Sequence, residues 1–200
     1  QRWTPDSLDA LRPSLRKWDC LLLQLEVPIN VTLRAIAMAR SKGVTVCLDP
    51  APAPVGSVPP ELLQVDLLTP NEAETQALTG LPLGDLQEAK AAAQDLQRRG
   101  ARQVVLKLGQ RGALALAENG VAAHIEPAQV NVVDTTAAGD AFSAALGVAI
   151  ARGEDLISAT RFACSAGAAA VTRSGAQEAM PTFTEVQTLL KSQEFRVSIL

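Results

Sequence analysis

The chain has 200 residues, and 18 Lys and Arg against 21 Asp and Glu give it a net charge of −3. Hydrophobic residues make up 48% and charged residues 20%, which is ordinary for a folded globular protein and excludes a disordered or collagen-like chain. The mild acidity and the 3% aromatic content exclude the basic field and stacking surfaces that nucleic-acid-binding proteins use.

Targeting signals and cysteine pairing are not evident. No run of about 18 apolar residues predicts a membrane span, and no basic-then-apolar segment predicts a signal peptide. Cys20, Cys47 and Cys164 are few, odd in number and far apart, which favours free thiols in a reducing cytoplasm. We expect one α/β domain over residues 1–200. Because the chain starts at Gln1 rather than Met, we also expect it to be part of a longer protein.

Apolar runs and helical patterns alternate through the first half of the chain. The expected strands are Asp19–Leu25, Val44–Leu48, Leu62–Thr69 and Gln103–Leu108. The expected helices are Pro5–Leu15, Pro28–Gly43, Asn71–Leu78 and Asp85–Arg99. Five prolines between residues 49 and 60 predict a stiff loop without a strand or a long helix.

The second half adds a hairpin and three helices. Ala113–Ala117 and Val121–Ile125 flank an Asn-Gly turn, and helices are expected at Ala138–Ala151, Glu154–Val171 and from Thr184. Strands that alternate with helices predict βαβ units. We therefore expect a Rossmann-like α/β fold, with a mostly parallel sheet that carries helices on both faces.

Several well-known catalytic motifs are absent. The sequence contains no G-x-x-x-x-G-K-[ST], no G-x-G-x-x-G, no G-x-S-x-G and no H-E-x-x-H. The lone histidine, His124, lies in a strand-like run, which favours a partly exposed strand residue over a catalytic or metal-binding one. Hydrolase triads and zinc chemistry therefore lack their key residue.

The segment 134–142 joins a short apolar run to a helix through small residues. The N–H groups of Ala138, Gly139 and Asp140 are expected to be unpaired in the first helical turn, where the helix dipole attracts anions. The Asp140 carboxylate would repel a phosphate there, unless it accepts a proton from a hydroxyl that attacks a phosphoryl group. Alternatively, Asp140 is a favourable first-turn acid, and Asp134 or Thr136 is a cap.

The same segment, DTTAAGDAF, resembles the second signature of the ribokinase/PfkB carbohydrate kinase family, and in particular of its ribokinase members. Five other stretches match in order, and the likeness extends from about Asp19 to Pro181. These are Gln24–Glu26 (a strand end that reaches the sugar), Asp49–Ala53 (Asn-Pro-Ala-Pro in the family), Thr69–Glu74 (Pro-Asn-x-x-Glu), Leu108–Ala113 (the nucleotide loop) and Ala170–Ala176 (the monovalent-cation segment).

The resemblance implies a three-layer ribokinase-like fold that lacks the N-terminal strands and lid, together with a set of site residues. Asp140 would be the general base, and the backbone N–H groups from Ala137 to Asp140, including those of Ala138 and Gly139, would form an anion hole. The nucleotide and its Mg²⁺ would be held by Asn71, Glu74, Lys107, Gly109, Gln110 and Gly112, with Cys164 near the adenine. Glu26 would contact the sugar, and a K⁺ ion would be surrounded by Asp134 and the carbonyls of Thr136, Ala170, Arg173 and Gly175.

Some of these residues have a second interpretation. Asn71 followed by Glu74 is also a capping-box pattern at a helix start, and both roles can coexist. Glu26 can be a loop carboxylate in water. Lys107 stands where the family commonly has a small hydroxyl residue; it can pair with a phosphate or extend as a solvated tip. Cys164 stands where several members have a polar residue.

The implied reaction is phosphorylation of D-ribose by ATP to D-ribose 5-phosphate, with Mg²⁺ and K⁺, in a homodimer of the full-length protein. Alternatives are another sugar or nucleoside acceptor (fructose, 2-keto-3-deoxygluconate, adenosine), a non-catalytic nucleotide-binding remnant, or a module that completes a partner's sheet. Without N-terminal neighbours, the strand Asp19–Leu25 would have an exposed edge. We expect the isolated chain to be marginally stable.

Overall fold

The computed structural model describes residues 3–4, 6–17 and 20–200. The described residues form a seven-stranded sheet in the order β1-β2-β3-β4-β5-β6-β7. Strands β1 to β4 run parallel, whereas β4 to β7 pair antiparallel. Their bounds are β1 Cys20–Leu23, β2 Thr45–Leu48, β3 Leu67–Leu68, β4 Gln103–Lys107, β5 Ala113–Leu116, β6 Ala122–Ile125 and β7 Val197–Ile199.

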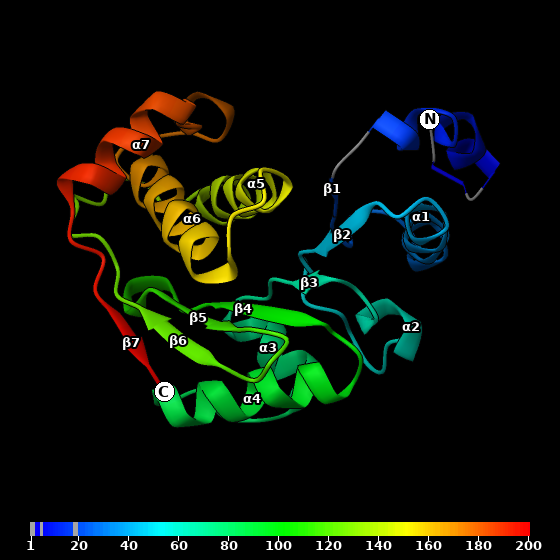
Figure 1. The fold of residues 1–200 in the computed structure, drawn as a ribbon, viewed down its shortest axis with the longest axis horizontal. Helices are drawn as coiled ribbons and strands as arrows, with labels where there is room; N and C mark the ends of the chain where they lie inside the picture. Colours follow the sequence, from blue (N-terminus) through cyan, green and yellow to red (C-terminus); the bar gives the residue numbers. More distant parts are fainter. Residues whose placement is uncertain (1–2, 5, 18–19) are drawn as a thin grey trace.

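Helices cover both faces of this sheet (Figure 1). Helices α5, α6 and α7 lie on one side, and α3 and α4 lie on the other (Figure 1). The bounds are α1 Ile29–Arg40, α2 Pro60–Leu63, α3 Glu72–Thr79, α4 Leu86–Arg98, α5 Ala138–Ala151, α6 Leu156–Ala170 and α7 Phe183–Ser192. The predicted three-layer α/β fold is therefore confirmed. No helix within the described ranges is long and apolar enough to cross a membrane.

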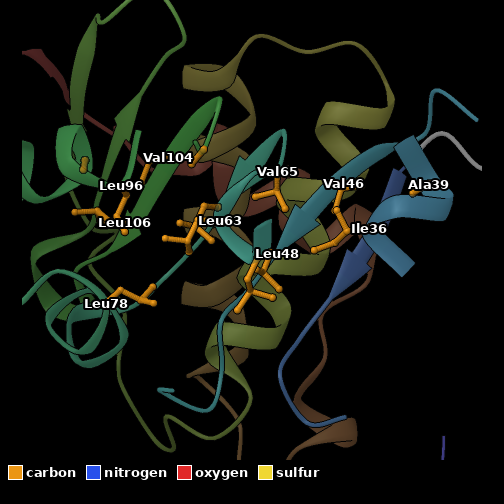
Figure 2. Close-up of a cluster of buried hydrophobic side chains, with 14 of the residues drawn as sticks. Ile36, Ala39, Val46, Leu48, Leu63, Val65, Leu78, Leu96, Val104 and Leu106 are labelled. Carbon is orange, nitrogen blue, oxygen red and sulfur yellow. The ribbon is translucent and has the colours of Figure 1, made fainter. Parts of the chain in front are cut away.

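The central strands are apolar on both sides because each side packs against a layer of helices. In β2, Val46 and Leu48 belong to the buried cluster on the α1 and α4 side, whereas Cys47 belongs to the cluster on the α5 and α6 side. Figure 2 shows part of the first cluster, with Val46 close to Ile36 of α1. Each fully buried side chain of this kind stabilises the fold by about 1.5–3 kcal/mol, so the strands are firmly held.

Two sequence predictions were wrong in the N-terminal part. Of the strand expected over Leu62–Thr69, only Leu67–Leu68 is a strand, and Leu62 and Leu63 lie in α2. The proline at the first position of α2 favours a helix start, and a short apolar run does not distinguish a strand from a buried helix.

The expected helix Pro5–Leu15 is two 3-10 helices, η1 at Asp6–Leu11 and η2 at Ser14–Lys17, because Pro13 interrupts it. Pro5 and Asp19, which bound two expected elements, lie outside the described residues. Strand β7 was not predicted.

The parallel arrangement of β1 to β4 decides where a site can form. The carboxyl ends of parallel strands meet at one edge of a sheet, and ligands of open α/β sheets bind there. The residues that follow the four strands are Gln24, Asp49, Thr69 and Leu108. The N-terminus of α5 and the short helix η3 (Gly109–Arg111) are near this edge, since they share the lining of its cavities.

Candidate active site

The start of helix α5 has an unusual backbone. Its N-cap residue, Ala137, has φ 60° and ψ 7° and makes no side-chain cap, and it is the single non-glycine with positive φ in the described part of the chain. The N–H of Ala138 donates to the Thr135 carbonyl at 3.3 Å, so the expectation that it is unpaired was wrong. The N–H groups of Gly139 and Asp140 belong to the first turn, where no intrahelical acceptor exists. They are the stronger candidates for binding an anion.

The Asp140 carboxylate is exposed and points into a cavity rather than into the protein core. Its Oδ1 accepts a hydrogen bond of 2.8 Å from Nε2 of Gln24, which follows β1. This bond fixes one oxygen and leaves the carboxylate on the solvent side. An exposed, oriented carboxylate is suited to accept a proton from a bound hydroxyl.

The start of α5 contributes to the lining of two cavities. The smaller, of about 230 Å³, is lined by the ends of β1, β2 and β3 and by α5, including Gln24, Asp49, Thr69, Asp140 and Ser143. The larger, of about 510 Å³, contains seven residues that the sequence analysis assigned to the nucleotide or to the anion hole. They are Lys107, Gly109, Gln110, Gly112, Ala138, Gly139 and Cys164.

The wall of the larger cavity at 109–112 is held by backbone geometry and one arginine. Gly112 has φ +82°, and a Cβ there would lie 2.0 Å from the carbonyl oxygen of Ile125. The Arg111 guanidinium donates to the Leu83 carbonyl at 2.6 Å and pairs with Glu72. The His124 ring contacts the Arg111 carbonyl through Nε2 at 2.6 Å, so this histidine supports the loop.

Asn71 and Glu74 form a complete capping box at the start of α3. The Asn71 side chain accepts from the Glu74 N–H at 2.9 Å, and the Glu74 carboxylate accepts from the Asn71 N–H at 2.7 Å. Burial raises the pKa of Glu74. The capping role is therefore confirmed, and a role toward the nucleotide remains a prediction. Because Asn71 pairs with Lys107 in a β-bridge, the cap lies beside the end of β4.

The side chain of Lys107 does not extend into solvent. Its Nζ donates to Oδ2 of Asp49 at 2.6 Å, and the side chains are only 12% and 5% exposed. The Ser143 hydroxyl donates to the same oxygen at 2.7 Å. The ammonium is thus fixed between β2, β4 and α5, at the boundary of the two cavities.

Asp134 joins the two segments that the resemblance assigns to a monovalent cation. Its carboxylate accepts from the Gly175 N–H at 3.0 Å and from the Thr136 N–H at 2.9 Å. These bonds lower the pKa of Asp134 to about 2, so it is ionised near neutral pH. The Ala170 carbonyl accepts from the Arg173 N–H at 3.2 Å, and the Arg173 side chain pairs with Glu185.

Cys164 lies where it was expected, whereas Glu26 does not. Cys164 is buried in the larger cavity wall, and burial raises the pKa of its thiol to about 12, so it presents a neutral, weakly polar surface. Glu26 is exposed and lines neither of the cavities described above. Gln24, two residues earlier, reaches the smaller cavity instead. Neither Asp49 nor Ser143 was predicted as a site residue, although Asp49 directly follows a predicted parallel strand.

The left-handed backbone of Ala137 gives a first test. An alanine at φ 60° costs about 1–2 kcal/mol relative to the right-handed region, whereas glycine adopts that conformation readily. We expect Ala137→Gly to raise the free energy of unfolding by about 1 kcal/mol, measured by urea denaturation. Ala144→Gly, within regular α5, is the matched control and should lower it by about the same amount. If both variants lowered the free energy of unfolding by the same amount, the backbone of Ala137 would not be strained.

Comparison with known proteins gives consistent matches. A family model described as "pfkB family carbohydrate kinase" matches residues 13–183. The chain is 38% identical over 174 residues to a ribokinase from Haemophilus influenzae, and 35% identical over 185 residues to one from Staphylococcus aureus. These alignments cover 86% and 92% of this chain but 56% and 60% of the relatives.

A solved structure, ribokinase of Arabidopsis thaliana complexed with ribose and ATP, superposes with a TM-score of 0.82 at 34% identity. It is matched over 95% of this chain and 60% of its own. The matching segment of the family model includes both cavities and the start of α5. With this shared sequence and fold, the chain belongs to the pfkB family of carbohydrate kinases.

Proposed function

We propose that this chain carries the nucleotide-binding and proton-accepting part of an ATP-dependent sugar kinase. One observation supports this most strongly: the start of α5 lines both cavities, with Asp140 in the smaller one and Ala138 and Gly139 in the larger one. ATP occupies the larger cavity, and the sugar hydroxyl enters the smaller one. In this proposal residues 1–200 form one α/β domain, although the chain spans only about three fifths of the length of the relatives.

In the proposed mechanism, Asp140 accepts the proton of the attacking hydroxyl while its other oxygen is held by Gln24. Such a base contributes about 10²–10⁴-fold to the rate. The N–H groups of Gly139 and Asp140 stabilise the charge on the transferred phosphoryl group; one preorganised donor of this kind contributes about 3–4 kcal/mol. Positioning and charge stabilisation are what phosphoryl transfer mainly requires.

Mg²⁺ would neutralise the phosphate charge when bound. Within the described residues no group of three His, Cys, Asp or Glu side chains is arranged to hold a metal. Mg²⁺ commonly keeps several waters and takes one or two protein carboxylates. Glu74 is proposed for this limited role through water, because both of its carboxylate oxygens accept hydrogen bonds from Asn71, which pairs with Lys107 at the end of β4.

K⁺ would act as an activating ion bound by Asp134 and the nearby carbonyls of Thr136, Ala170, Arg173 and Gly175. Carboxylate and carbonyl oxygens suit this ion, and Asp134 already ties residue 175 to residue 136. We expect turnover to be higher in K⁺ than in Na⁺, and Asp134→Asn to remove most of this difference. Because the pKa of Asp134 is lowered to about 2, the K⁺ effect should not change between pH 5 and 8 through this group. An unchanged K⁺ response in the variant would contradict the site.

D-Ribose is the proposed acceptor, with phosphorylation at the 5-hydroxyl. The similarity to two ribokinases supports this choice, and the neighbouring structure holds ribose and ATP. Fructose, 2-keto-3-deoxygluconate and adenosine are the other candidates. Homodimer formation is part of the proposal and can be measured by sedimentation.

The test is ADP release from ATP with a panel of these acceptors, for this chain and for the full product of its reading frame. Ribose should give the largest kcat/KM. If another acceptor stimulated ADP release most, that compound would replace ribose as the proposed acceptor, and the proposed kinase activity would stand. ATP binding without stimulation by any acceptor, in both proteins, would indicate a non-catalytic nucleotide-binding protein.

A further inference from the structure

The buried ion pair between Asp49 and Lys107 connects the two cavities. Asp49 follows β2 and lines the smaller cavity, whereas Lys107 ends β4 and lines the larger one. Their contact of 2.6 Å crosses the boundary between them. Removing two charges from water costs several kcal/mol per ion, so a buried pair is weak evidence for a purely stabilising role.

The ammonium of Lys107 is also close to the proposed anion hole. A Cβ built on Gly139 would lie 3.8 Å from Nζ, so the charge faces the first turn of α5. An ammonium has three N–H donors, and Asp49 takes one of them. A phosphoryl group bound at Gly139 would be within reach of this positive charge.

Asp49 has one oxygen that the fold does not satisfy. Oδ2 accepts from both Lys107 and Ser143. Oδ1 is buried and has no hydrogen-bond partner among the described residues, although Asp49 is only 5% exposed. A buried acceptor without a partner is costly and is normally explained by a ligand, a water or a functional role. Since Asp49 lines the smaller cavity, the carboxylate is oriented for a ligand as well as for the lysine.

We propose that Lys107 contacts the transferred phosphoryl group and that Asp49 is the residue that positions it. This inference rests on the proposed function; it assigns Lys107, already expected near the nucleotide, to the transferred phosphoryl group and adds Asp49 to the site. The resemblance places Asn and a small hydroxyl residue at positions 49 and 107, so this chain has a charged pair where those members have a neutral one. The exchange adds a cation beside the anion hole and a carboxylate that holds it.

The double variant Asp49→Asn/Lys107→Thr separates function from structure. Lys107→Thr alone leaves a buried carboxylate without its cation, and this variant is expected to be destabilised. The double variant removes both charges and should keep a melting temperature near that of the parent chain. Loss of binding in the double variant is therefore attributable to the missing ammonium.

The experiment measures the Kd of Mg·AMP-PNP and of Mg·ADP by calorimetry for the parent chain, Asp49→Asn and the double variant. We expect the double variant to lose about tenfold in affinity for Mg·AMP-PNP and less than about twofold for Mg·ADP, because only the former has the third phosphoryl group. Asp49→Asn keeps the lysine but removes the carboxylate that holds it. The affinity of this variant for Mg·AMP-PNP should fall about threefold.

Unchanged Kd values in the folded double variant would overturn the phosphoryl contact while leaving the proposed function intact. An unchanged value in Asp49→Asn alone would overturn the positioning role of Asp49. If the parent chain bound neither nucleotide, the proposed function would fail together with this inference.

Discussion

Asp140→Asn is expected to lower acceptor-dependent ADP release by about 10²–10⁴-fold, because an amide cannot accept the hydroxyl proton. The amide is nearly isosteric and can still accept from Gln24, so the helix start should keep its shape. The Kd of Mg·ATP should therefore stay within a few-fold. Both quantities are measured on the full product of the reading frame, by a coupled ADP assay and by calorimetry.

Asp85→Asn is the matched control for this variant. Asp85 caps α4 and accepts from the N–H groups of Gln87 and Glu88, and it belongs to neither cavity described here. Asn is also a good N-cap, so turnover should be unchanged. Near-normal turnover of Asp140→Asn would show that the proton acceptor has been assigned wrongly.

Gly112→Ala is expected to lower the free energy of unfolding by about 3 kcal/mol or more. The residue has φ +82° and ψ −130°, a conformation that is accessible mainly to glycine. The new Cβ would also lie 2.0 Å from the backbone oxygen of Ile125, which cannot move aside without breaking the β5–β6 pairing. Urea denaturation measures the loss, and nucleotide binding should weaken because this loop lines the larger cavity.

Gly120→Ala provides the comparison. Gly120 has φ +83°, close to that of Gly112, but nothing lies within 4 Å of a Cβ built there. Gly120→Ala should lower the free energy of unfolding by only about 1–2 kcal/mol, because only the left-handed conformation is unfavourable for alanine there. If both variants lost the same amount, the collision with Ile125 would not be the reason that Gly112 is required.

The elements that the sequence predicts best are those with local chemical signals. Helices were expected to begin at Asn71 and Asp85, and these residues cap α3 and α4, while Asn119-Gly120 does separate the two strands of a hairpin. Helix α5 has the predicted bounds. Caps, glycine turns and alternating apolar residues are set by the nearest few residues, so no long-range contact is needed to recognise them.

The features that the sequence did not predict depend on contacts between distant segments. The pairing of β7 with β6 joins residues about 75 apart, and nothing near Val197 marks it. The short apolar run at Leu62 and Leu63 has no periodicity that excludes either a strand or a helix. Tertiary packing decides such cases.

The site residues also divide into those that the sequence identifies and those whose role depends on contacts between distant segments. The resemblance pointed to Asp140, Gly139 and Lys107, and the structure brings them together. It included Asp49 in a matched stretch but gave it no role, and its contact with Lys107 appears only when the carboxyl ends of β2 and β4, on either side of β3, meet at one edge of the sheet. Glu26 and Gln24 are two residues apart, and the sequence could not show which of them reaches the smaller cavity.

The most direct test follows the backbone amides of this chain by NMR while Mg·AMP-PNP is added. We expect the amide signals of Ala138, Gly139 and Asp140 to shift together with those of residues 109–112, whereas adenosine should shift only the latter group. Saturable binding of Mg·AMP-PNP that leaves the amides of residues 138–140 unchanged would contradict a phosphoryl site at the start of α5.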